Sequence, residues 1–162
     1  MLNGIKYAIF DMDGTLINSL IIWDALWKML GEKYLSIKEF SVSEEMDKAI
    51  RTMTLKEAME LFKNTYGVKE PLDDILFTVN ERVAVFYTNE VKVKDGVIDF
   101  LDALNKKGMK MCVATATEKS LVMLAVKSCG LDKYFDTVLS CNDIGKGKDK
   151  PDIYLRIGRA YV

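Results

Sequence analysis

Three short stretches of the chain are almost wholly apolar and do not alternate between apolar and polar residues. They are YAIFD at 7–11, KMCVAT at 110–115 and FDTVLS at 135–140. Strands that are covered on both faces of a parallel sheet have this continuous pattern, whereas half-exposed strands alternate. We therefore predict three buried parallel strands.

Helical patterns accompany these strands. Residues 95–108 and 117–130 place apolar side chains at helical spacing, and each stretch ends at a glycine, the usual stop signal. The positions that define the two faces are Val97, Phe100, Leu101 and Leu104, and then Leu121, Leu124, Ala125 and Ser128. The alternation of strand and helix predicts an α/β fold with a Rossmann-like, doubly wound parallel sheet.

Residues 19–92 differ because helical periodicity runs through them and no strand pattern is convincing. We interpret them as an inserted cap domain, a bundle of four helices, with a core domain formed by residues 1–18 and 93–162. The first three apolar stripes are Trp23, Leu26, Trp27, Leu30 and Tyr34; Val42, Met46, Ala49, Ile50 and Met53; and the run from Thr54 to Gly67. The fourth, after Pro71, contains Leu76, Val79, Val83 and Phe86. Capping boxes at Ser41-x-x-Glu44 and Thr54-x-x-Glu57 predict where the second and third helices begin.

Charge and composition restrict the function. The 23 basic and 24 acidic residues nearly balance, so nothing indicates a nucleic-acid partner or a membrane surface, and a small molecule is the expected partner. No apolar run approaches the roughly 18 residues of a membrane span. Three cysteines without a C-x-x-C pair fit a reducing cytoplasm. The absence of histidine excludes the commonest general base and the serine triad.

Polar side chains follow the predicted strands where the carboxyl ends of a parallel sheet bind ligands. Asp11 ends the first strand and Asp13 follows it, Thr115 ends the second, and Lys148 comes after the third. This set suits phosphoryl transfer: Asp11 as nucleophile, Asp13 as acid and base, and Thr115 and Lys148 as phosphate ligands. Two neighbouring carboxylates need a cation, for which Mg²⁺ is the natural choice.

The quoted residues resemble the haloacid dehalogenase (HAD)-like superfamily. DMDGTL at 11–16 is similar to its first motif, CVATAT at 112–117 to its second and GKGKDKPDIYL at 145–155 to its third. The resemblance implies the same roles for Asp11, Asp13, Thr115 and Lys148, with Mg²⁺ on the Asp11 carboxylate and the Asp13 backbone carbonyl. Lys146 and Lys150 compete for the lysine role, and Lys148 is preferred because it lies four residues before Asp152, as in the family pattern.

Within the superfamily, the chain looks most like the β-phosphoglucomutase-like phosphatases with a helical cap. This resemblance implies a Mg²⁺-dependent phosphatase that hydrolyses a small phosphomonoester, such as a sugar phosphate, through an aspartyl-phosphate on Asp11. A phosphosugar mutase is an alternative, although Trp23 stands where mutases of the group carry a histidine. A phosphoacceptor or non-catalytic module is another.

The fourth motif of the superfamily, one or two acids after a further strand, has no match, because no Asp or Glu follows Asp152. We expect a sheet truncated after its third core strand, as in a fragment of a longer product, with a second chain over the open edge or a degenerate relative of the family as the alternatives. We also expect weak Mg²⁺ binding and little turnover by these 162 residues alone. The first strand would keep an unpaired edge, through which the chain could self-associate.

Overall fold

The computed structural model describes residues 4–50 and 53–160, and the chain divides into two compact units. The first, here called the α/β unit, comprises residues 1–19 and 87–162, and the second, the helical unit, comprises residues 20–86. The interpretation of the inserted residues as a cap domain stays a prediction.

The sheet of the α/β unit contains β1 (Tyr7–Phe10), β2 (Lys110–Thr115) and β3 (Thr137–Ser140). The strands lie in the order β1-β2-β3 and both pairs are parallel, with Ile9 opposite Cys112 and Thr115 opposite Ser140. The predicted parallel α/β fold is therefore confirmed. Because the strands are parallel, their carboxyl ends lie together at one end of the sheet.

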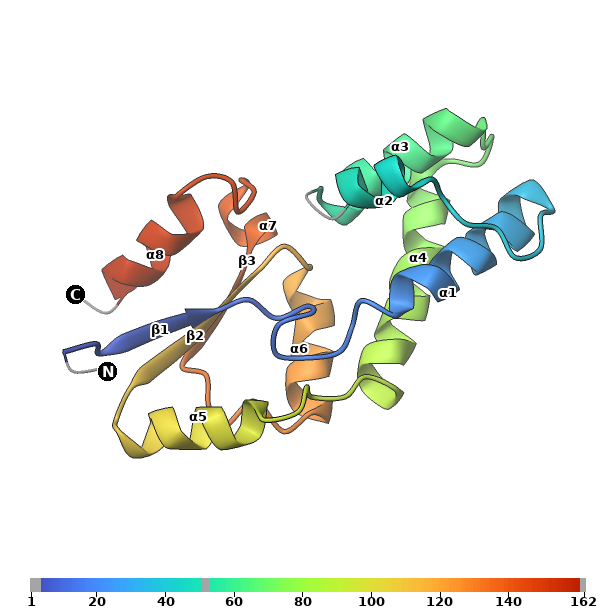
Figure 1. Ribbon diagram of the computed structural model, residues 1–162. Coiled ribbons are helices and arrows are strands. Elements are labelled where there is room, and N and C mark those ends of the chain that lie inside the picture. The colour runs from blue at the N-terminus through green and yellow to red at the C-terminus, as the bar shows by residue number, and fades with distance from the viewer. Residues whose placement is uncertain (1–3, 51–52, 161–162) are drawn as a thin grey trace. The chain divides into compact units, whose positions relative to one another are not determined.

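Helices cover both faces of this sheet (Figure 1). On one face, α7 (Cys141–Ile144) and α8 (Asp152–Ala160) bury Ile153 and Ile157 against Cys112 and Ala114. On the other face lie α5 (Val97–Lys106) and α6 (Lys119–Ser128), and the ring of Phe100 on α5 meets that of Phe10 edge-on at 6.3 Å. This is the predicted doubly wound arrangement.

Three details of the predicted core are wrong, and one of them is Phe100 on the predicted face of α5, which is 51% exposed. The first strand is not buried, since Tyr7 and Ile9 are 42% and 40% exposed. β1 lies at the edge of the sheet, where it pairs only with β2 among the described residues. The buried face of α6 consists of Leu121, Val122, Ala125 and Val126, whereas Leu124 is half-buried and Ser128 is exposed. The buried face therefore shares Leu121 and Ala125 with the predicted stripe and is completed by Val122 and Val126.

The helical unit contains α1 (Ile22–Leu30), a π-helical turn η1 (Gly31–Leu35), α2 (Glu44–Ile50), α3 (Leu55–Tyr66) and most of α4 (Leu72–Asn89). Its core is aromatic, with ring contacts that link Trp23, Trp27, Phe40, Phe62 and Tyr66. Among residues 4–50 and 53–160, no helix is long and apolar enough to cross a membrane.

One of the two predicted capping boxes is present. The hydroxyl of Thr54 accepts from the Glu57 N–H at 3.3 Å, and the Glu57 carboxylate accepts from the Thr54 N–H at 2.7 Å. The box at Ser41 is wrong: α2 begins later, and the hydroxyl of Ser43 accepts from the Met46 N–H at 3.2 Å. The predicted continuation toward Met53 crosses residues 51–52, which lie outside the described residues.

Candidate active site

A tight turn after β1 brings the two carboxylates together. Met12 is fully buried, and its carbonyl accepts from the Leu16 N–H at 2.9 Å, so the chain folds back directly after the strand. Gly14 has φ +74°, a conformation that suits glycine. Its N–H donates to the hydroxyl of Ser19 at 3.2 Å, and its carbonyl accepts from the Lys94 ammonium at 2.9 Å. The turn is thus fixed from several sides.

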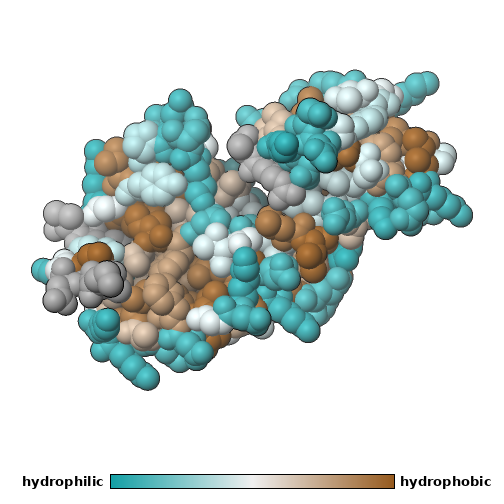
Figure 2. All heavy atoms as spheres, viewed as in Figure 1, coloured by the Kyte–Doolittle hydropathy of each residue, from teal (hydrophilic) through white to brown (hydrophobic). Residues whose placement is uncertain are grey.

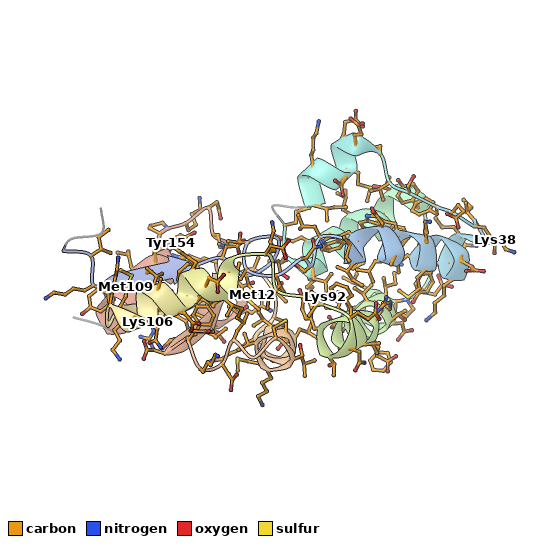
Figure 3. The ribbon with its side chains drawn as sticks, turned by 60° about the horizontal axis from the view of Figure 1, so that its bottom comes forward. Met12, Lys38, Lys92, Lys106, Met109 and Tyr154 are labelled. Carbon is orange, nitrogen blue, oxygen red and sulfur yellow. The ribbon has the colours of Figure 1, made fainter. Side chains whose placement is uncertain are left out.

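The segments that enter and leave the insertion run beside each other at this turn. The Asn18 N–H donates to the Lys92 carbonyl at 2.9 Å, and Ile17 and Val93 form an antiparallel bridge. In Figure 3, Met12 and Lys92 lie at one end of the α/β unit, and Met109, which precedes β2, lies at the other end. The carboxylates therefore stand at the carboxyl end of the sheet.

Asp11 is held by a cation and a hydroxyl. Its Oδ1 accepts from the Lys148 ammonium at 2.6 Å, and its Oδ2 accepts from the Thr15 hydroxyl at 2.8 Å. Both side chains of the ion pair are partly exposed, 27% for Lys148 and 38% for Asp11. This carboxylate stays accessible from solvent and has a positive charge beside it.

Asp13 is held by hydroxyl groups instead. Its Oδ1 accepts from the phenol of Tyr87 at 2.5 Å, and its Oδ2 accepts from the Thr117 hydroxyl at 2.7 Å. The Thr115 hydroxyl points to the same Oδ2 from 3.5 Å. The two carboxylates, which look alike in the sequence, therefore have different surroundings, one cationic and one of neutral donors.

Tyr87 remains a hydrogen-bond donor because its proton is hard to remove. Its side chain is only 4% exposed. Burial raises the pKa of the phenol far above its ordinary value, and the negative charge of Asp13 raises this pKa further. The phenol is therefore protonated throughout the physiological pH range.

The ends of β2 and β3 are tied together beside Asp13. Thr115 is 1% exposed, and its hydroxyl accepts from the Thr117 N–H at 3.0 Å. Ser140, the last residue of β3, is fully buried and donates from its hydroxyl to the Thr117 carbonyl at 2.7 Å. These bonds orient the Thr117 hydroxyl toward Asp13.

The four residues predicted from the sequence lie together, but in two pairs. Lys148 contacts Asp11, and Thr115 lies beside Asp13. The competing lysines have other partners, because Lys146 pairs with Asp152 at 2.7 Å and Lys150 with Asp149 at 3.4 Å.

Sequence reasoning missed Tyr87, Thr117 and Ser140. Thr117 belongs to the quoted CVATAT stretch, so the motif itself could have indicated it. Ser140 ends a predicted strand, which is a weaker signal. Tyr87 lies 74 residues from Asp13 in a helical pattern, and no local signal marks it.

The oxygen atoms at the carboxyl end of the sheet are of the type that binds a small hard cation. Within the described residues no group of three or more His, Cys, Asp or Glu side chains could hold a metal. Mg²⁺, however, usually takes one or two protein carboxylates and keeps several waters or phosphate oxygens. The Asp11 carboxylate and the Asp13 backbone carbonyl, both hard oxygen donors, fit that requirement.

The fold and this site define a class of hydrolase, and comparison with known families agrees. The sequence profile of the haloacid dehalogenase-like hydrolases matches residues 5–162, so the chain belongs to this family. The predicted family and hydrolase class are therefore confirmed.

Individual relatives are more distant. The chain is 24% identical over 150 residues to the phosphorylated carbohydrates phosphatase of Thermotoga maritima, covering 93% of this chain and 68% of that protein. It is 25% identical over 150 residues to the pyrophosphatase PpaX of Halalkalibacterium halodurans, covering 91% and 65%. The chain thus spans about two thirds of the length of these curated relatives.

Solved structures share the fold. CbbY from Rhodobacter sphaeroides, crystallised with phosphate, superposes with a TM-score of 0.76 at 25% identity, over 93% of this chain and 69% of that one. A HAD hydrolase of family IA, variant 3, from Entamoeba histolytica superposes with a TM-score of 0.70 at 24% identity, over 96% and 69%. The predicted resemblance to the HAD-like superfamily and its β-phosphoglucomutase-like phosphatases is confirmed at the level of fold and family.

Proposed function

We propose that the chain is a phosphatase for small phosphomonoesters and that Asp11 is its nucleophile. The observation that carries the proposal is the Asp11–Lys148 pair, with 2.6 Å between Oδ1 and Nζ, at the carboxyl end of a parallel sheet and two residues before a second carboxylate. A carboxylate beside an ammonium can receive a phosphoryl group whose charge the ammonium stabilises.

Hydrolysis takes place in two steps, formation of an aspartyl-phosphate and its hydrolysis by water. An Asp11 carboxylate oxygen attacks phosphorus, the bond to the ester oxygen breaks, and protonated Asp13 gives its proton to the departing alkoxide. The Asp13 carboxylate then takes a proton from water, which attacks the same phosphorus and breaks its bond to Asp11. Inorganic phosphate leaves, and both side chains return to their starting states.

The other residues support these steps by position. Lys148 stabilises the charge on the phosphoryl oxygens, and Thr115 donates its hydroxyl to one of them. Asp11 and the Asp13 carbonyl would hold Mg²⁺, which would reduce the repulsion between the nucleophile and the phosphate. Phosphorylated carbohydrates, named for the Thermotoga relative, are the substrate class we propose.

Release of inorganic phosphate from a panel of sugar phosphates, with and without Mg²⁺, tests the proposal. We expect slow, Mg²⁺-dependent release that the Asp11→Asn variant loses by about 1,000-fold or more, as expected when a nucleophile is removed. Release that persists in Asp11→Asn would contradict the role of Asp11.

The same proteins distinguish a phosphatase from a phosphoacceptor. We expect beryllofluoride, an analogue of the phosphoryl group, to bind the wild type and not Asp11→Asn, as followed by ¹⁹F NMR. Stable phosphorylation of Asp11 by acetyl phosphate without release of phosphate would indicate a phosphoacceptor module. Transfer of phosphate between two positions of one sugar would indicate a mutase.

A further inference from the structure

Tyr87 and Thr117 each donate a hydrogen bond to the Asp13 carboxylate, and they come from different elements. The Tyr87 phenol donates to Oδ1 at 2.5 Å and the Thr117 hydroxyl to Oδ2 at 2.7 Å. The first donor comes from the last turn of α4 and the second from the loop after β2. Because each oxygen has its own donor, the carboxylate cannot rotate about its Cβ–Cγ bond without breaking both bonds.

The backbone of Tyr87 is itself anchored in the α/β unit. Its carbonyl accepts from the Ser128 hydroxyl at 2.5 Å, so the end of α4 is tied to α6. The Tyr87 side chain is buried, which leaves the phenol few alternative orientations. The donor to Oδ1 is therefore held more rigidly than a surface hydroxyl could be.

Orientation matters for a proton donor more than for most groups. A general acid must place its proton within about 3 Å of the leaving oxygen. A displacement of about 1 Å can reduce the rate by about 100-fold. Asp13 is only half-buried, so packing alone does not fix its carboxylate and the orientation depends on hydrogen bonds.

We propose that Tyr87 is a positioning residue, which holds the Asp13 carboxylate in the orientation that exchanges a proton with the leaving group. The proposal rests on the proposed function, in which Asp13 is the acid and base. It extends that function to a residue that lies outside the three motifs and 74 positions from its partner.

The Tyr87→Phe variant, which removes only the hydroxyl, tests this role through the leaving group. Alkyl phosphates need a proton on the departing oxygen, whereas aryl phosphates such as p-nitrophenyl phosphate leave readily without one. We expect kcat to fall by about 10- to 100-fold on an alkyl phosphate and by less than about 3-fold on the aryl phosphate. The matched control is Tyr134→Phe, which removes a phenol that donates to Asp102 at 2.7 Å, and we expect it to leave both rates unchanged.

A double-mutant cycle separates positioning from general damage. If Tyr87 acts through Asp13, Tyr87→Phe should cause no further loss in an Asp13→Asn background. Equal losses on both substrates, or losses that add to those of Asp13→Asn, would overturn the proposal.

Crystal structures of the wild type and Tyr87→Phe provide a readout that does not need turnover. We expect the Asp13 carboxylate to leave its position or to occupy two orientations in the variant. A carboxylate that keeps its orientation on Thr117 alone would overturn the proposal. A different result would show that the proposed function fails: either the wild type releases no phosphate, or the Asp11→Asn variant releases it as fast as the wild type.

Discussion

Lys148 is the residue whose loss should separate catalysis from stability. Both members of its pair with Asp11 are partly exposed, and such pairs contribute only about 0–1 kcal/mol to folding. Removing a group that stabilises transition-state charge costs about 100- to 1,000-fold in kcat. We expect Lys148→Met to reduce phosphate release by about 100-fold and to change the free energy of unfolding by less than about 1 kcal/mol.

Lys146→Met is the matched control, because Lys146 lies in the same loop and pairs with Asp152 instead of Asp11. Phosphate release and urea unfolding, measured on both variants, check the prediction. Equal losses of activity in the two variants would mean that the loop's general positive charge matters and that the contact with Asp11 does not.

The sequence could indicate Asp11, Asp13 and Lys148 because each stands in a short motif beside a strand end. It could not indicate that the two carboxylates have different partners. That difference depends on Tyr87 and Thr117, whose hydroxyls reach Asp13 from other elements. Contacts across long sequence separations leave no local pattern to read.

Among single elements, Gly31 shows how closely a side chain can approach the backbone of a helical turn. It begins η1 with φ −61°, an ordinary helical value, so its conformation does not require glycine. A Cβ at this position, however, would lie 2.1 Å from the Phe40 Cβ. Phe40 is buried in the aromatic core of the helical unit, so it cannot move away easily.

We therefore expect Gly31→Ala to destabilise the chain by about 1–3 kcal/mol through overpacking. Gly158→Ala is the control, because Gly158 lies in α8 with no heavy atom within 4 Å of an added Cβ. This control should stabilise the chain by roughly 0.5–1 kcal/mol, since alanine favours helices over glycine. Urea unfolding of both variants measures the difference, and a neutral Gly31→Ala would refute the packing argument.

Helix starts were predictable only where one capping pattern stood alone. Thr54-x-x-Glu57 has no competing register, and the structure forms it. Around α2, Ser41 and Ser43 both offer a hydroxyl within one turn, and the structure uses Ser43. Choosing between them depends on where Met46 and Ile50 are buried, which is a property of the packed helical unit.

At the scale of the whole molecule, the parallel sheet followed from continuous apolar runs, but the exposure of β1 did not. Tyr7 and Ile9 look like core residues in the sequence, but they lie exposed on β1, a strand at the end of the order β1-β2-β3. Figure 2 shows apolar surface over this part of the α/β unit. Burial of a strand depends on its neighbours as well as on its own residues.

Because β1 is an exposed strand at the edge of the sheet, we expect the chain to self-associate through it. An exposed apolar edge strand is a template for another strand, and a single charge is an effective way to block it. We expect the weight-average mass from light scattering to rise with protein concentration for the wild type and to stay at that of a monomer for Ile9→Lys. Phe77→Lys is the matched control, because Phe77 is 64% exposed on α4 in the helical unit, and its replacement should leave the association intact. A wild type that is monomeric at every concentration, or association that both variants lose equally, would contradict pairing through β1.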